Sequence, residues 1–333
     1  MKIRDILLFL LTVSLSCIFF SCSDNSPTQD FIQKQPTDES KQPSDDSVDH
    51  TTGSNDKEEG GDEEGEEEDE NVSTSVNPDF HVYLCFGQSN MEGNAIIEEQ
   101  DKKHVSERFL MMAAVDNPDL NRIKGEWYTA IPPLARRYTG LTPADYFGRK
   151  LVESLPEDIS VGVINVSVAG CGIDLFNKDK FATYLPNQAD WLKNIVKEYE
   201  GNPYNCLIQL AKKAQNRGVI KGILLHQGES NTGDVNWPTN VKEIYEDMLA
   251  DLDLKAEDVP LLVGEVVHAN QNGVCAYHNL IIAEIPTLIP TAYVISSDGC
   301  PAAADNLHFS AEGYRILGRR YADKMLSLLE IDK

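Results

Sequence analysis

The chain has 333 residues and a formal net charge of −25, and most of that charge lies near its N-terminus. Residues 23–79 carry 19 acidic side chains against 3 lysines, so residues 80–333 keep a net charge of only −10. Such a mildly acidic part argues against nucleic acid or an anionic membrane surface as a partner. The seven cysteines include no C-x-x-C pair, so the sequence shows no zinc or redox motif.

Residues 1–22 are typical of an export signal. Basic residues precede an apolar run, residues 6–20, that is too short and wrongly flanked for a transmembrane helix. The following Ser21-Cys22 resembles the cleavage site of a bacterial lipoprotein, which predicts lipidation of Cys22. We therefore expect an exported protein, periplasmic or at the cell surface, whose lipid anchor is its only membrane contact. Lipidation at Cys17, a plain secretory signal and a single anchor helix are the alternatives.

Residues 23–78 contain little that a core could bury. The segment consists mainly of Ser, Thr, Pro, Gly, Asp and Glu, and residues 63–70 are almost entirely acidic. It cannot offset its ordering entropy, so we expect a disordered acidic linker that self-repulsion keeps extended. Calcium binding is less favoured than a solvated tether because the spacing matches no EF-hand loop. The folded domain is expected over residues 79–333.

From residue 80 onward, apolar runs of strand length alternate with amphipathic stretches of helix length. The expected strands are 81–86, 159–168, 220–226, 260–267 and 291–297. The expected helices are 143–155, 188–199, 204–217, 239–252, 275–288 and 311–329. Strands that are apolar on both faces and separated by helices predict a parallel sheet covered on both sides. The predicted fold is therefore α/β, a three-layer α/β/α sandwich around a central five-stranded parallel sheet.

The segment from Asn94 to Thr142 interrupts this alternation. It follows the first expected strand and shows few clear periods. In an α/β sheet, an insertion at this point lies over the carboxyl edge, where binding residues concentrate. The segment either walls a pocket or packs as a peripheral loop.

The first candidate for chemistry is Ser89. A strand rich in β-branched and aromatic residues runs into Gly87-Gln88-Ser89-Asn90, which puts the hydroxyl at the carboxyl edge of the sheet. A serine hydroxyl is a weak nucleophile until a base and an orienting acid are brought to it. Its neighbours Gln88 and Asn90 are candidate substrate-binding residues.

A base for this serine is available after the last expected strand. In Asp305-Asn306-Leu307-His308, an acid three residues before a histidine can turn back onto one ring nitrogen and leave the other free. The carboxylate then fixes the tautomer and stabilises the imidazolium. Both sites follow strands and so lie at the same edge of the sheet. A helix-capping aspartate beside a surface histidine is the alternative.

Two further strands end in polar or glycine-rich turns. In His226-Gln227-Gly228-Glu229, Gln227 can donate to an oxyanion and Glu229 can orient a histidine, unless this turn only satisfies buried groups. The strand ending at Ala169-Gly170 exposes backbone N–H groups that suit an oxyanion hole. A phosphate-binding loop is the rival, but neither known glycine spacing is present.

The four blocks together resemble a known pattern. In order they are Gly87-Gln88-Ser89-Asn90-Met91, Ala169-Gly170, His226-Gln227-Gly228-Glu229-Ser230 and Asp305-x-x-His308. The chain resembles the SGNH (GDSL-like) hydrolase superfamily. Within it, the chain is similar to the sialate O-acetylesterases and acetylxylan esterases of carbohydrate esterase family six. The resemblance covers roughly residues 80–328 and implies a flavodoxin-like SGNH hydrolase fold.

The resemblance implies a role for each block. Ser89 would be the nucleophile and His308 the general base. Asp305 would orient the histidine, with Glu229 as the contender because some relatives use that glutamate.

The resemblance also implies the oxyanion donors and the reaction. The donors would be the backbone N–H groups of Ser89 and Gly170 and the side chain of Gln227. The reaction would be two-step hydrolysis of O-acetyl groups on a carbohydrate, with acetylated xylan favoured and sialic acid as the alternative. No metal or organic cofactor is implied. A non-catalytic carbohydrate-binding relative and a lipid esterase or thioesterase are the rival readings.

The remaining histidines and cysteines are assigned to structure. Cys275 and Cys300 lie near loops after the late strands and are a possible disulfide pair in an oxidising compartment. The histidines taken as structural or superficial are His50, His81, His104, His268 and His278.

Overall fold

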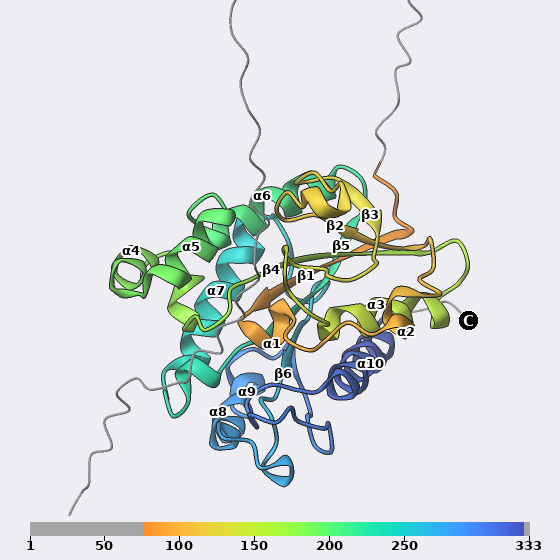
Figure 1. The fold of residues 1–333 in the computed structure, drawn as a ribbon. Coiled ribbons are helices and arrows are strands. Elements are labelled where there is room, and N and C mark those ends of the chain that lie inside the picture. Colours follow the sequence, from red (N-terminus) through yellow and green to blue (C-terminus); the bar gives the residue numbers. More distant parts are fainter. Residues whose placement is uncertain (1–75, 330–333) are drawn as a thin grey trace, which may run out of the picture. The chain divides into compact units, whose positions relative to one another are not determined.

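The computed structural model of the chain describes residues 76–329 (Figure 1). The predicted export signal, the lipidation site at Cys22 and nearly all of the predicted linker lie outside the described residues. Within residues 76–329, no helix combines the length and apolar character needed to span a membrane.

A seven-stranded sheet forms the middle of the described part, in the order β3-β2-β4-β1-β5-β6-β7. All neighbouring strands are parallel except β2 and β3, which pair antiparallel at one edge. The strands are β1 (Phe80–Gly87), β2 (Phe109–Met112), β3 (Trp127–Thr129), β4 (Ser160–Ser167), β5 (Val219–His226), β6 (Leu261–Gly264) and β7 (Ala292–Ile295).

The α/β class and the parallel core of the sheet are confirmed, but the predicted number of five strands is wrong. The five expected strands are present as β1, β4, β5, β6 and β7. The two additional strands come from the segment 94–142, where β2 adds to the free edge of β4 and β3 pairs with β2. Each has only three or four residues, too few to show a period in the sequence.

The two faces of the sheet bury different side chains of β1. Val82, Leu84 and Phe86 belong to a core cluster shared with helices α5, α6 and α7. Tyr83 and Cys85 belong to a second cluster shared with α3 and α10. This alternation follows from the two-residue period of a strand. The predicted three layers are therefore present, as the placement of α6 and α7 opposite α3 and α10 in Figure 1 shows.

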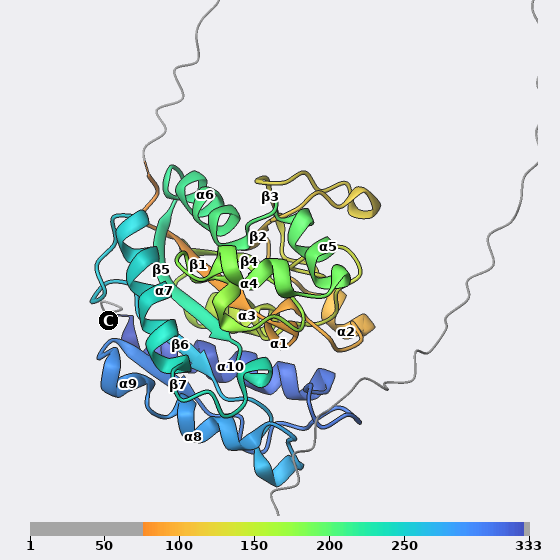
Figure 2. The ribbon, with the colours of Figure 1, turned by 90° about the vertical axis from the view of Figure 1, so that its left-hand side faces the viewer.

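Five helices of nine residues or more cover the described sheet, and Figure 2 views them from the side of α4 and α7. They are α3 (Pro143–Ser154), α5 (Asp190–Glu198), α6 (Pro203–Gln215), α7 (Trp237–Asp251) and α10 (Ala311–Leu328). The shorter ones are α1 (Ser89–Glu92), α2 (Glu99–Lys102), α4 (Phe181–Tyr184), α8 (Asn279–Ile282) and α9 (Ile285–Leu288). The 3-10 turns are Pro118–Leu120, Ile173–Leu175, Leu185–Asn187, Glu229–Asn231, Ala269–Gln271 and Ala276–His278.

The predicted helix over residues 275–288 is broken into a 3-10 turn, α8 and α9. Pro286 explains the last break because it lies in the first turn of α9, where its missing N–H has no helical partner to lose. The other long helices match their predicted positions to within a few residues.

Cys275 and Cys300 are free thiols in the structure, so the disulfide considered from the sequence is not formed. The Cys275 sulfur lies 3.7 Å from the carbonyl oxygen of Glu229. Cys300 is instead buried in the core cluster that includes α3 and α10. The two thiols therefore lie in different surroundings.

Candidate active site

Three of the four sequence blocks follow adjacent strands. Strands β4, β1 and β5 are neighbours, and Gly87 at the end of β1 pairs with Ser167 on one side and His226 on the other. The turns after these strands therefore meet at one carboxyl edge of the sheet. Gly87 is required there, because a Cβ on it would lie 2.1 Å from the carbonyl oxygen of His226.

A hydrogen-bonded series joins the first block to the last one. The Nε2 atom of His308 lies 2.9 Å from the hydroxyl of Ser89, and its Nδ1 atom lies 2.7 Å from a carboxylate oxygen of Asp305. The other oxygen of Asp305 accepts the backbone N–H groups of Leu307 and His308, both at 3.0 Å. The loop geometry thus fixes the carboxylate, and the carboxylate fixes the imidazole.

The hydrogen bonds to Asp305 also affect its charge. Partial burial alone would raise the pKa of this carboxyl group, but the backbone and side chain of His308 and the backbone of Leu307 donate to it. Together these donors hold the pKa of Asp305 below its ordinary value. The carboxylate is therefore ionised wherever it is needed to face an imidazolium.

The hydroxyl of Ser89 opens into a pocket of about 290 Å³. Among the described residues, neither the Ser89 nor the Gly170 backbone N–H donates to a protein acceptor. The neighbouring Ala169 N–H, by contrast, donates to the Glu92 carboxylate at 3.3 Å. Free N–H groups on two residues that line the pocket of the serine are suited to stabilising an oxyanion. The pocket is lined by Gln88, Ser89, Asn94, Ala169, Gly170, Glu229, Ser230, Leu307 and His308.

The structure does not bring the side chain of Gln227 to this pocket. Its amide nitrogen, which has two N–H donors, lies within hydrogen-bond distance of the Gln88 side-chain oxygen at 3.0 Å, the Cys171 carbonyl at 3.1 Å and the Asn231 side-chain oxygen at 2.8 Å. Its amide oxygen accepts the indole N–H of Trp237. The fully buried amide therefore ties neighbouring turns together. The predicted role of Gln227 as an oxyanion donor does not match this geometry.

The side chains of Gln88 and Asn90 also form hydrogen bonds that connect the nucleophile turn to other segments. The Gln88 side-chain oxygen accepts the backbone N–H of Ser230 at 3.2 Å, which holds the turn after β5 against the nucleophile turn. Asn90 is fully buried, donates to the Leu307 carbonyl at 3.1 Å and accepts from the Tyr314 hydroxyl at 2.6 Å. Of these two predicted substrate-binding residues, only Gln88 lines the pocket.

Glu229 is the second acid near the site, and its surroundings differ from those of Asp305. One of its oxygens accepts the side-chain N–H of Asn90. The other has no hydrogen-bond partner among the described residues. Burial raises the pKa of Glu229 above its ordinary value. The structure thus places Asp305, and not Glu229, in hydrogen-bond contact with the ring of His308.

Buried histidines near the site are held neutral. Burial lowers the pKa of His226 to about 3 and that of His278 to about 4. His278 packs edge-on against Trp237 with ring centroids 5.0 Å apart. Both histidines are buried. Among the described histidines, the one within hydrogen-bond distance of the serine hydroxyl is His308.

Three pocket residues were not singled out in the sequence: Asn94, Ser230 and Leu307. Asn94 begins the insertion, and it also lines an adjoining pocket of about 320 Å³ with Arg136 and Tyr138. The ends of the insertion therefore line these pockets, which is one of the two alternatives predicted for it. Its middle is not a peripheral loop, because β2 and β3 join the sheet. Proximity to the serine block could have suggested Asn94, and no sequence signal points to Leu307.

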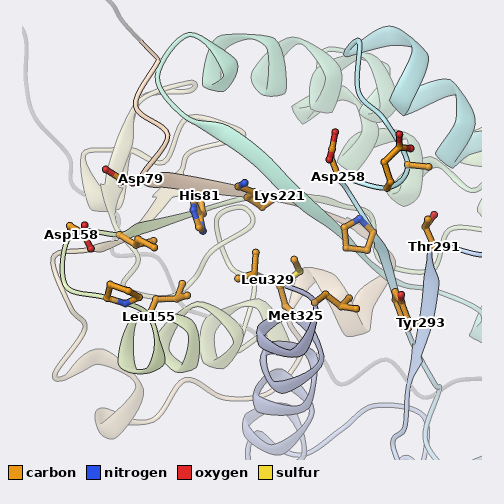
Figure 3. Close-up of a pocket in the computed structure, with 16 residues that line it drawn as sticks. Asp79, His81, Leu155, Asp158, Lys221, Asp258, Thr291, Tyr293, Met325 and Leu329 are labelled. Carbon is orange, nitrogen blue, oxygen red and sulfur yellow. The ribbon is translucent and has the colours of Figure 1, made fainter. Parts of the chain in front are cut away.

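A larger pocket of about 870 Å³ lies at the opposite edge of the sheet, where the strands begin (Figure 3). His81 and Lys221 line it from the adjacent strands β1 and β5, together with Met325 of α10. None of the described residues that line it is a serine or a cysteine. The contacts that join Ser89, His308 and Asp305 lie at the smaller pocket, so the smaller pocket is the candidate active site.

Known proteins are similar to this chain in sequence and in fold. The model of a family described as "Carbohydrate esterase, sialic acid-specific acetylesterase" matches residues 79–327. A probable carbohydrate esterase of Arabidopsis thaliana is 22% identical over 265 residues, covering 75% of this chain and 92% of that protein.

Three solved structures show the same fold. An Arabidopsis thaliana protein has a TM-score of 0.55 at 18% identity, covering 75% of this chain and 99% of its own. The structure of NanS has a TM-score of 0.53 at 16% identity, covering 76% and 98%. A carbohydrate acetylesterase from Xanthomonas citri has a TM-score of 0.51 at 18% identity, covering 72% of this chain and 54% of its own.

Proposed function

Because this chain belongs to the carbohydrate esterase family described as sialic acid-specific acetylesterases, we propose that it is a serine esterase that removes O-acetyl groups from carbohydrates. One observation carries the proposal. The imidazole of His308 lies between the Ser89 hydroxyl at 2.9 Å and the Asp305 carboxylate at 2.7 Å, which is the arrangement that activates a serine.

In the first step, the Ser89 oxygen attacks the ester carbonyl while Nε2 of His308 takes its proton. The carbonyl oxygen becomes an oxyanion, and the free N–H groups of Ser89 and Gly170 donate to it. The imidazolium is stabilised by Asp305, which stays ionised because its pKa is low. Collapse of the tetrahedral intermediate breaks the bond between the carbonyl carbon and the sugar oxygen, which takes the proton from His308 and leaves as a hydroxyl, and an acetyl group remains on Ser89.

In the second step, water replaces the sugar. His308 takes a proton from the water as its oxygen attacks the acetyl carbonyl, and the same two N–H groups receive the oxyanion. The intermediate then releases acetic acid, which ionises to acetate and a proton in water, and His308 returns its proton to Ser89. Atoms and charges balance with water as the only further reactant.

The size of the pocket supports a small acyl group. A volume of about 290 Å³ lies at the lower end of the range for small-molecule sites. Acetylated xylan is the substrate expected from the sequence, and O-acetylated sialic acid is the alternative that the family description favours. Acetate release from a panel containing both would choose between them.

The proposal is tested with Ser89→Ala beside the wild type on p-nitrophenyl acetate and on acetylated glycans. We expect the variant to lose at least about 10³-fold in kcat, because the serine acts as a unit with its base. Equal turnover by the two proteins contradicts the proposal. Wild-type protein that binds glycans without releasing acetate would indicate a non-catalytic relative. A preference for long acyl chains in a series of p-nitrophenyl esters would indicate a lipid esterase.

A further inference from the structure

Trp191 is placed where the packing of its own helix does not require a tryptophan. It is the second residue of α5 and is 54% exposed. The side chains of α5 that are buried in the core are Leu192 and Val196, four residues apart on one helix face. Trp191 lies outside that face, so burial against the sheet does not account for the largest side chain of the helix.

The other two tryptophans of the chain serve the core. Trp237 is fully buried and donates its indole N–H to Gln227. Trp127 packs edge-on against Phe80, with ring centroids 4.9 Å apart. Trp191 is the exposed one of the three, and its indole N–H has no acceptor among the described residues. Its donor is therefore free for a ligand.

The ring of Trp191 adjoins the candidate active site. A Cβ on Gly170 would lie only 2.5 Å from the Cη2 atom of Trp191, so the edge of the indole ring is in direct contact with this glycine. Gly170 lines the pocket together with Ser89 and carries one of the two free N–H groups. On the same turn, the Tyr184 hydroxyl accepts the backbone N–H of Gly172 at 2.6 Å. Two aromatic residues thus flank the turn that faces the ester.

The pocket and the ring together match the two parts of an acetylated sugar. A pocket of about 290 Å³ accepts the acetyl ester, which leaves the sugar ring at the mouth. Sugar rings have apolar C–H faces and hydroxyl edges, and an indole offers an apolar face and one N–H donor. We propose that Trp191 is a carbohydrate-binding platform, on which a pyranose ring of the substrate packs while its acetyl group enters the Ser89 pocket. This inference rests on the proposed esterase function.

The kinetic test compares Trp191→Ala and Trp191→Phe with the wild type on two substrates. The substrates are p-nitrophenyl acetate, which has no sugar, and acetylated xylo-oligosaccharides or O-acetylated sialic acid, whichever the wild type hydrolyses. We expect Trp191→Ala to raise KM for the sugar substrate about 3- to 10-fold more than KM for p-nitrophenyl acetate. Trp191→Phe keeps an aromatic face and should recover most of the difference. Equal effects on both substrates show that Trp191 only supports the Gly170 turn and overturn the proposal.

A binding measurement separates this inference from the proposed function. In the Ser89→Ala variant, adding the same sugar substrate should change the tryptophan fluorescence, and the additional change Trp191→Phe should abolish that signal. A fluorescence change that persists without Trp191 contradicts the platform. Failure of the wild type to release acetate from any glycan refutes the esterase proposal itself. An active wild type whose sugar KM does not respond to Trp191→Ala refutes only the platform.

Discussion

Two acids lie near His308, and they differ in burial, in hydrogen-bond partners and in the direction of their pKa shifts. Asp305 precedes α10 in an exposed loop, and it contacts the imidazole and two backbone N–H groups. Glu229 follows β5, is buried, and contacts Asn90 of the nucleophile turn. Hydrogen bonds lower the pKa of Asp305, whereas burial raises the pKa of Glu229. The first acid is arranged to hold a charge, and the second to hold two turns together.

This contrast extends to the neighbours of each acid. In the turn after β5, the amide nitrogen of Gln227 is surrounded by three acceptor oxygens of the protein itself. In the loop before α10, the Nε2 atom of His308 is within hydrogen-bond distance of the Ser89 hydroxyl. The β5 turn therefore supports the site from beneath, and the α10 loop supplies its proton-transfer groups.

The sharpest test of this comparison is the pair Asp305→Asn and Glu229→Gln. Asn can still accept the two backbone N–H groups but cannot stabilise an imidazolium, so kcat should fall by about 10²- to 10⁴-fold. Gln can still accept from Asn90, so Glu229→Gln should lower kcat by about tenfold or less. Steady-state kinetics on p-nitrophenyl acetate measure both.

The two substitutions serve as controls for one another, since each exchanges a carboxylate for an amide of the same shape. Unfolding curves should show that both variants are folded. If Glu229→Gln abolishes activity while Asp305→Asn retains it, Glu229 is the acid that supports His308 and the comparison is reversed.

A second test removes the support beneath the site. Gln227→Ala leaves the indole N–H of Trp237 and the Cys171 carbonyl without their partner. Leaving such buried groups unpaired should lower the free energy of unfolding by about 1–3 kcal/mol. Denaturant unfolding measures this. A 100-fold loss of kcat with unchanged stability would instead restore Gln227 as an oxyanion donor.

The smallest expected effect is an opposite pH dependence of stability. The folded pKa of Asp305 lies below 3.8, so its contribution is fully present above pH 3.8 and is lost as the pH falls through the folded pKa. The folded pKa of Glu229 lies above 4.5, so the wild type loses stability as the pH rises from 4.5 through the folded pKa.

The variants should reveal these two slopes separately. Relative to the wild type, Glu229→Gln should gain stability as the pH rises above 4.5. Relative to the wild type, Asp305→Asn should recover stability as the pH falls below 3.8. Melting temperatures from about pH 3 to about pH 7 measure both trends. Parallel curves for all three proteins would show that neither carboxyl group has a shifted pKa.

Local patterns in the sequence determined much of the fold. Strands that are buried on both faces read as continuous apolar runs, so all five parallel strands of the predicted sheet were found within a few residues. The chain direction of a strand fixes which end carries the following turn. That is why Ser89 and Gly170 could be assigned to one edge before any distance was known.

Short elements could not be predicted, because they exist only through their neighbours. Strands β2 and β3 have three or four residues each and form because the edge of β4 offers unpaired backbone groups. The break before α9 follows from Pro286, a helix breaker that lies inside the predicted helix 275–288.

The tertiary structure alone decided how the polar side chains of the site are used. Gln227 and Glu229 stand in a sequence block that suits either catalysis or support, and only their buried partners show support. Asp305 and His308 lie 3 residues apart, a spacing that fits a helix cap equally well, and only the 2.9 Å contact to Ser89 separates the two. Hydrogen bonds between side chains depend on distances of a few ångströms across segments that are far apart in the chain, and sequence spacing does not carry that information.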